Sequence, residues 1–157
     1  MPSRRWATLL VGVITIGCRR GPALPDGDIL ATLTLPPLHG GTFDATALKG
    51  KPTLVVFMTP TCSHCLATLP RAMRAASAND ANIIAVFVAG KAPNAQGVVD
   101  HVAYSGPALV DDGTLRKRYA VDAVPFTLVL GADGRAVDAY QGEQDEATLA
   151  GALASAR

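Results

Sequence analysis

Cys62 and Cys65 are the residues of this sequence whose type and spacing could do chemistry. Only Ser63 and His64 lie between them. A pair at this spacing can be a redox couple, half of a metal site, or two cysteines that simply pack. A disulfide between them would close a loop too short to restrict the unfolded chain much. Reactivity is therefore the more economical explanation, provided that the third cysteine, Cys18, does not remain as a free thiol in the mature domain.

The flanking sequence favours a reactive position for the first cysteine. Residues 53–58 (TLVVFM) form an apolar run typical of a strand buried on both faces, and residues 63–78 carry helix-forming side chains. Cys62 then falls at the first turn of a helix, where free N–H groups and a partial positive charge stabilise a thiolate and lower its pKa. Cys65 follows one turn later on the same face. We therefore expect Cys62 to attack and Cys65 to resolve.

His64 is a candidate tuning residue, because it places a side chain that can carry a positive charge beside the attacking sulfur. A stabilised thiolate means a stabilised reduced form, which makes the disulfide more oxidising. The alternative is that His64 is an exposed spacer without influence on the cysteines.

The N-terminus indicates export. Arg4 and Arg5 precede an uncharged stretch over residues 6–17 that is too short for a comfortable membrane span. Cys18 follows the small residue Gly17, an arrangement that resembles a bacterial lipoprotein signal. We predict an export signal over 1–18 with lipidation at Cys18, a tether over 19–28, and one domain over 29–157. An ordinary cleaved signal and an uncleaved anchor are the alternatives. The expected location is extracytoplasmic, periplasmic and membrane-anchored.

Composition and pattern predict one α/β domain. The formal net charge is +1, and from residue 21 onward 10 basic residues face 13 acidic ones, so a nucleic-acid partner is not expected. Apolar runs at 53–58 and 82–90 predict central strands, and residues 125–140 predict a hairpin around an Asp-Gly turn. Residues 29–43 are expected to form two short strands, an N-terminal β-hairpin extension. With helices between the strands, the pattern favours a central mixed sheet flanked by helices.

Two longer segments carry a family resemblance. LPPLHGGTFDATALKGKPTLVVFMTPTCSHC and YAVDAVPFTLVLGADGRAVDAYQG resemble the thioredoxin-fold, membrane-tethered bacterial thiol–disulfide oxidoreductases of the TlpA/ResA type. The similarity runs from about Leu33 to Leu153. It implies a thioredoxin fold and a cis Val124–Pro125 bond facing the cysteines, with the backbone of Val124 pairing with a substrate strand.

The resemblance also implies partners. Cysteine-containing proteins, apocytochrome c among them, would be the substrates, and a membrane or periplasmic thiol redox protein would regenerate the active form. The disulfide would be the only redox centre needed, so no cofactor and no metal are expected.

The sequence departs from the family at positions that bear on the direction of electron flow. Thr61, a candidate substrate-binding residue with Val124 and Pro125, stands where the family commonly has Trp. Thr68 replaces a frequent Glu, and Val56 replaces an acidic or amide residue of the central strand. Without these groups no carboxylate is evident to relay the proton of Cys65.

Three other functions fit parts of the sequence. TPTC resembles the approach to the active site of a thiol peroxidase (peroxiredoxin-like), with Thr59 as the residue that contacts peroxide. Cys62, Cys65 and His64, with His39 or His101, could instead serve a metal-binding delivery module, although no second paired-ligand motif is present. The third is a thioredoxin fold that only binds partners, which the intact cysteine pair disfavours.

Overall fold

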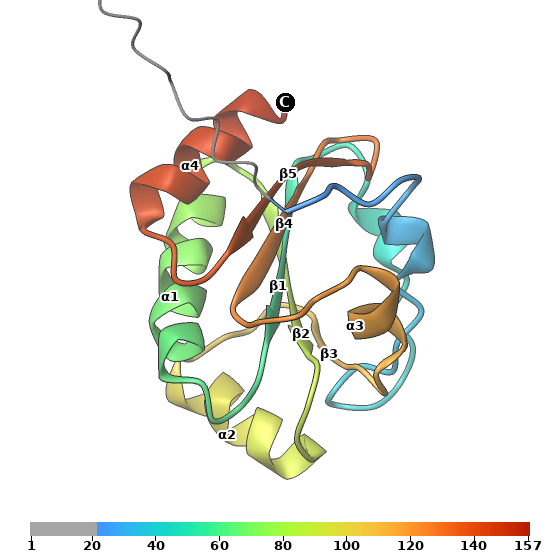
Figure 1. The fold of residues 1–157 in the computed structure, drawn as a ribbon, viewed down its shortest axis with the longest axis vertical. Helices are drawn as coiled ribbons and strands as arrows, with labels where there is room; N and C mark the ends of the chain where they lie inside the picture. Colours follow the sequence, from blue (N-terminus) through green and yellow to red (C-terminus); the bar gives the residue numbers. More distant parts are fainter. Residues whose placement is uncertain (1–21) are drawn as a thin grey trace, which may run out of the picture.

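A mixed five-stranded sheet forms the centre of the computed structural model, which describes residues 22–157 (Figure 1). The strand order is β3-β2-β1-β4-β5. The first three strands of the chain pair in parallel, and β4 and β5 add antiparallel to the β1 edge. The strands are β1 (Thr53–Met58), β2 (Asn82–Phe87), β3 (Ala108–Val110), β4 (Phe126–Leu130) and β5 (Ala136–Gln141). The predicted mixed sheet and the 125–140 hairpin are therefore confirmed.

Helices and N-terminal turns cover both faces of this sheet (Figure 1). On one face α1 and α4 lie side by side, and on the other α3 lies beside the N-terminal segment. The helices are α1 (Ser63–Ala78), α2 (Ala92–His101), α3 (Thr114–Arg118) and α4 (Glu146–Ser155). The export signal (1–18), the first part of the tether and Cys18 lie outside the described residues.

The central strand β1 is buried along its whole length, as its continuous apolar sequence predicts. Leu54 and Val56 pack against α1 and α4, and Val55 and Phe57 pack against the opposite layer. This alternation is the two-residue period of a strand. The buried strand ends at Met58, and the short loop that follows leads to Cys62 at the start of α1.

The expected N-terminal β-hairpin does not form within residues 22–157, and this part of the fold prediction is wrong. A 3-10 turn, η1 (Leu30–Thr32), occupies the first predicted strand, followed by a second turn, η2 (Ala45–Leu48). Ile29, Leu30 and Leu33 are all buried, which is the spacing of a helical turn and not of an alternating strand.

Two features explain why this segment covers the sheet instead of extending it. The Asp28 carboxylate accepts a hydrogen bond from the N–H of Ala31 at 3.1 Å, which caps the turn. Further along, Pro37 forms an isolated antiparallel bridge with Leu109 of β3, and because Pro36 and Pro37 have no N–H to give, this pairing does not extend into a strand ladder. The backbone N–H of Ile29 instead donates to the carbonyl of Gly134, 2.8 Å away in the β4–β5 turn.

Candidate active site

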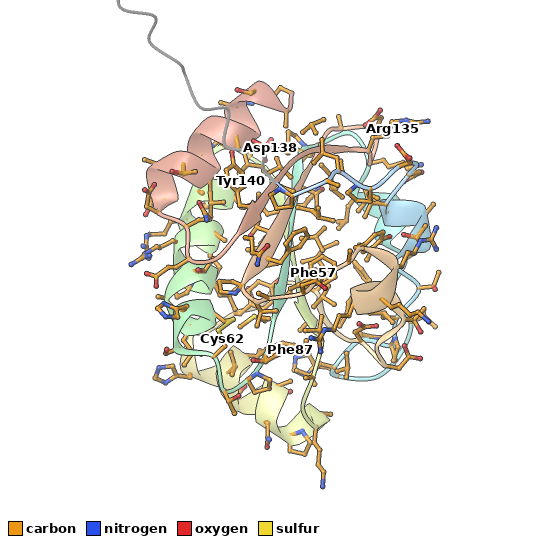
Figure 2. The ribbon with its side chains drawn as sticks, in the orientation of Figure 1. Phe57, Cys62, Phe87, Arg135, Asp138 and Tyr140 are labelled. Carbon is orange, nitrogen blue, oxygen red and sulfur yellow. A yellow bond between two sulfur atoms is a disulfide. The ribbon has the colours of Figure 1, made fainter. Side chains whose placement is uncertain are left out.

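The cysteine pair lies where β1 gives way to α1 (Figure 2). Cys62 is the N-cap residue of α1, in an extended conformation, and Cys65 is in the first turn. Their Cα atoms are 5.2 Å apart and their sulfurs are joined in a disulfide. The predicted placement of Cys62 at the start of a helix, with Cys65 in its first turn, is therefore confirmed.

The two sulfurs have different surroundings. Cys65 is fully buried, whereas Cys62 is half-buried. The Sγ of Cys62 accepts a hydrogen bond from the backbone N–H of Cys65 at 3.2 Å. A donor at the helix N-terminus stabilises negative charge on that sulfur more than on a thiol. The arrangement can therefore hold a Cys62 thiolate where another protein can reach it and keep Cys65 sheltered behind it.

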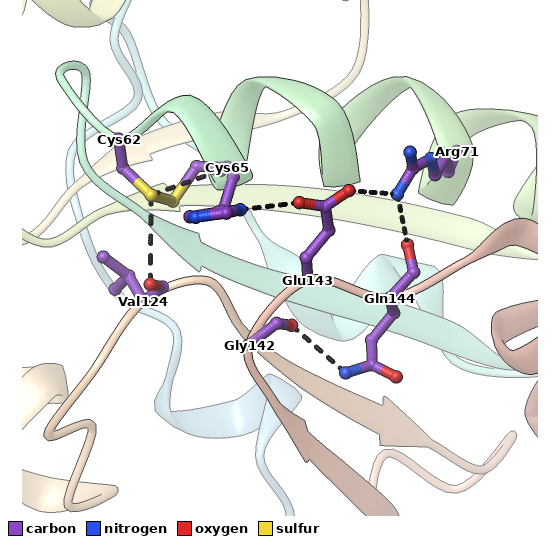
Figure 3. A network of polar contacts seen from close by, with 8 residues as sticks. Cys62, Cys65, Arg71, Val124, Gly142, Glu143 and Gln144 are labelled. Atoms are coloured by element: carbon purple, nitrogen blue, oxygen red, sulfur yellow. Dashed lines mark hydrogen bonds and ion pairs between the residues drawn. A yellow bond between two sulfur atoms is a disulfide. The ribbon is translucent and has the colours of Figure 1, made fainter.

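Val124 lies against the cysteine pair, although it is 62 positions from Cys62 along the chain (Figure 3). The Val124–Pro125 peptide bond is cis. The carbonyl oxygen of Val124 is 3.8 Å from the Sγ of Cys62, and Pro125 is buried. Thr61 is exposed next to Cys62. The structure thus brings Val124 to the disulfide, and the other two predicted substrate-binding residues, Pro125 and Thr61, adjoin Val124 and Cys62 in the chain.

His64 joins a charged cluster that the sequence analysis did not identify (Figure 3). Its Nδ1 is 2.6 Å from Oε2 of Glu143, and the other oxygen of that carboxylate accepts a 2.6 Å hydrogen bond from Nη1 of Arg71. The hydrogen bonds from His64 and Arg71 hold the pKa of Glu143 below its usual value. No local sequence signal joins these residues, because Glu143 lies 79 positions from His64.

Thr68 occupies the turn after Cys65, at the position where the family often has Glu. Its side chain is fully buried, and its hydroxyl has no hydrogen-bond partner among the described residues; the same holds for Thr127 on β4. A buried hydroxyl without a partner costs free energy relative to an apolar group of the same shape.

Replacing such a hydroxyl should therefore stabilise the protein. We expect Thr68→Val to raise the free energy of unfolding by about 1 kcal/mol. Thr53→Val is the matched control, because the equally buried Thr53 hydroxyl accepts a 3.2 Å hydrogen bond from Asn82, so its loss should destabilise. Urea unfolding of both variants measures the difference. A destabilised Thr68→Val would show that this hydroxyl has a partner, such as a buried water.

The remaining polar residues singled out in the sequence lie away from the disulfide or serve local structure. His39 and His101 are exposed. The Asp111 carboxylate accepts hydrogen bonds from the N–H groups of Leu115 and Arg116 at 3.0 and 2.9 Å, and so caps α3. In residues 22–157, no group of three or more His, Cys, Asp or Glu side chains is arranged to hold a metal ion. Within the same range, no helix combines the length and apolar character needed to cross a bilayer.

The comparisons with known proteins agree with this geometry. The profile of the thioredoxin-like domain family matches residues 42–157. The soluble secreted antigen MPT53 of Mycobacterium tuberculosis is 29% identical over 130 residues, covering 82% of this chain and 75% of the relative.

Solved structures extend the similarity. A secreted disulfide oxidoreductase of M. tuberculosis, described as homologous to E. coli DsbE, is 28% identical with a TM-score of 0.71, covering 82% of this chain and 99% of that one. A thiol:disulfide interchange protein of Chlorobium tepidum shares the fold at 17% identity and a TM-score of 0.71, covering 87% and 95% of the two chains. The chain therefore belongs to the thioredoxin-like domain family, and with its paired Cys62 and Cys65 it is a thiol–disulfide oxidoreductase of that family.

Proposed function

We propose that the protein exchanges disulfides with cysteine-containing proteins outside the cytoplasm. Cys62 forms the mixed disulfide with the substrate, either by attacking a substrate disulfide or by being attacked by a substrate thiolate. Cys65 resolves this mixed disulfide. The observation that supports this most is the asymmetry of the pair. Cys62, at the N-cap of α1, is half-buried beside the Val124 carbonyl, and Cys65 is fully buried. Only one sulfur is therefore placed to meet a partner.

The exchange proceeds through a mixed disulfide in either direction. In oxidation, a substrate thiolate attacks the Sγ of Cys62, the Cys62–Cys65 bond breaks, and Cys65 leaves as a thiolate. A second substrate thiolate then attacks the substrate sulfur of the mixed disulfide and releases Cys62. Two electrons pass from the substrate dithiol to the cysteine pair. Reduction runs the same steps backwards. The reduced Cys62 and Cys65 carry both electrons, so the proposed reaction uses no other cofactor.

The backbone next to Cys62 is suited to bind an extended substrate segment. Val124 is partly exposed and precedes the buried Pro125, and its carbonyl oxygen is 3.8 Å from the Cys62 sulfur. An extended peptide that pairs with the backbone here would bring its own cysteine to Cys62. Thr61 is exposed at the same edge and offers a hydroxyl to that segment.

Export and anchoring complete the proposal. The order of Arg4, Arg5, the uncharged residues 6–17 and Cys18 supports a signal with lipid on Cys18. The two Mycobacterium tuberculosis relatives named above are described as secreted. A membrane or periplasmic thiol protein would regenerate the pair, and apocytochrome c is one substrate with suitable cysteines.

The reduction potential of the Cys62–Cys65 pair tests the function and its direction. We expect the protein to equilibrate with glutathione at a potential well above the about −270 mV of a thioredoxin, because the N-cap donor and His64 favour the thiolate. His64→Ala should lower the equilibrium constant for oxidising glutathione about tenfold, which is about 30 mV. Ser63→Ala is the matched control, since Ser63 is exposed in the same motif and carries no charge.

Alkylation of free thiols followed by mass measurement gives these constants. A wild-type potential near about −270 mV or below would reverse the direction and indicate a reductase. A protein that forms no disulfide with glutathione would refute the proposed function. Faster turnover of hydrogen peroxide than of dithiol substrates would favour the thiol peroxidase instead.

A further inference from the structure

A short segment after β5 connects the two sides of the redox site. Gln141, the last residue of β5, pairs with Phe126 on β4, directly after Pro125. The next residue, Gly142, donates its backbone N–H to the carbonyl of Pro125 at 2.8 Å. The segment is therefore fixed by backbone hydrogen bonds to the side of the site that holds Val124 and Pro125.

The following residue fixes the same segment to the helix that carries the cysteines (Figure 3). The Glu143 carboxylate contacts Nδ1 of His64 and Nη1 of Arg71, each at 2.6 Å. His64 and Arg71 are seven residues apart, two turns along one face of α1. Arg71 also donates to the backbone carbonyl of Gln144 at 3.3 Å. One carboxylate thus joins two turns of α1 to the segment that holds Pro125.

The contact to Glu143 also determines which nitrogen of His64 carries hydrogen. An ionised carboxylate can only accept hydrogen bonds, so Nδ1 must be the donor. Nε2 is then the ring nitrogen that can gain or lose a proton. The side chain of His64 is 70% exposed, so little besides this contact restrains the ring. Without Glu143 the imidazole would be free to turn into solvent.

We propose that Glu143 is a positioning residue of the redox site, which holds His64 as the Nδ1–H tautomer and ties α1 to the Val124–Pro125 side. The proposal rests on the proposed function, in which His64 favours the Cys62 thiolate. Glu143 does not touch either sulfur in this arrangement and acts through His64. Arg71 supports this position indirectly, because it donates hydrogen bonds both to the Glu143 carboxylate and to the backbone carbonyl of Gln144.

Glu143→Ala tests this assignment, with Glu146→Ala as a closely matched control. Glu146 also joins α1 to the C-terminal part of the chain, through a 2.6 Å contact with Nε of Arg74, but Glu146 makes no hydrogen bond to His64. Nitrogen NMR of the histidine rings should show the Nδ1–H tautomer at His64 in the wild type and in Glu146→Ala. The Nε2–H tautomer should predominate in Glu143→Ala.

The equilibrium constant with glutathione then shows whether the position of His64 changes the reduction potential of the Cys62–Cys65 disulfide. We expect Glu143→Ala to lower the equilibrium constant for oxidising glutathione about threefold, and Glu146→Ala to leave it unchanged. In a His64→Ala background, Glu143→Ala should have no further effect, because its partner is gone.

Three results would overturn the assignment: an Nε2–H tautomer in the wild type, an unchanged constant in Glu143→Ala, or an equal loss in the His64→Ala background. The tautomer measurement on the reduced protein needs no exchange reaction. It therefore tests Glu143 separately from the wild-type disulfide equilibrium, whose failure would refute the proposed function itself.

Discussion

Cys62→Ser is expected to abolish thiol–disulfide exchange, with a rate loss of about a thousandfold or more, because, of the two paired sulfurs, it removes the one that a partner protein can reach. Cys65→Ser should behave differently. Cys62 can still attack a substrate disulfide in that variant, but no second sulfur is present to resolve the product. The mixed disulfide between Cys62 and the substrate should therefore accumulate.

Non-reducing electrophoresis and mass measurement of the trapped species distinguish the two variants. Cys18→Ser in the full chain is the control, since it replaces a cysteine without altering the Cys62–Cys65 pair. Mixed disulfides that accumulate in Cys62→Ser instead of Cys65→Ser would exchange the two roles. That result would contradict the assignment made from burial, in which Cys65 is fully buried and Cys62 is half-buried.

Phe57→Ala should cause the largest loss of stability among the substitutions considered for this protein, about 3–5 kcal/mol. Phe57 is fully buried on β1, and its ring lies 6.0 Å from those of Tyr119 and Phe126 (Figure 2). Removing it leaves a cavity between β1 and the strand that follows Pro125. A domain of this size has about 5–15 kcal/mol of stability, so much of it would be lost.

Phe43→Ala is the matched control for this prediction. Phe43 has the same side chain and packs against the same cluster, but it is only partly buried. We expect its loss to cost less than half as much, because fewer neighbouring atoms lose contact and water can fill the space. Urea unfolding followed by circular dichroism gives both values. Equal losses of unfolding free energy in the two variants would contradict the prediction that the buried Phe57 contributes more to stability than the partly buried Phe43.

The sequence by itself was sufficient for the features that depend on neighbouring residues. Residues 53–58 are apolar without interruption, which predicts a strand buried on both faces, and the helix formers from Ser63 onward place Cys62 at a helix start. The Asp-Gly turn between two apolar runs predicts the hairpin formed by β4 and β5. These signals are local, so they could be recognised before any tertiary contact was known.

The N-terminal segment shows where local pattern is insufficient. Residues 29–35 have the composition of a strand, but Ile29, Leu30 and Leu33 are buried together on one side of a 3-10 turn. These three side chains pack into the core cluster on one face of the sheet, and the segment pairs with the sheet through isolated bridges at Asp28–Arg135 and Pro37–Leu109. Tertiary burial therefore overrides strand propensity here.

Only the tertiary structure could bring Glu143 to His64 and Arg71, and the Val124 carbonyl to Cys62. These contacts join residues 62 to 79 positions apart. They exist because β4 adds antiparallel to β1 and β5 adds to β4, which carries the end of β5 to the beginning of α1. The spacing of these residues along the chain does not predict such long-range contacts. The sequence therefore determined the cysteine pair and its place at the start of a helix, and the sheet order decided which charged groups lie near that pair.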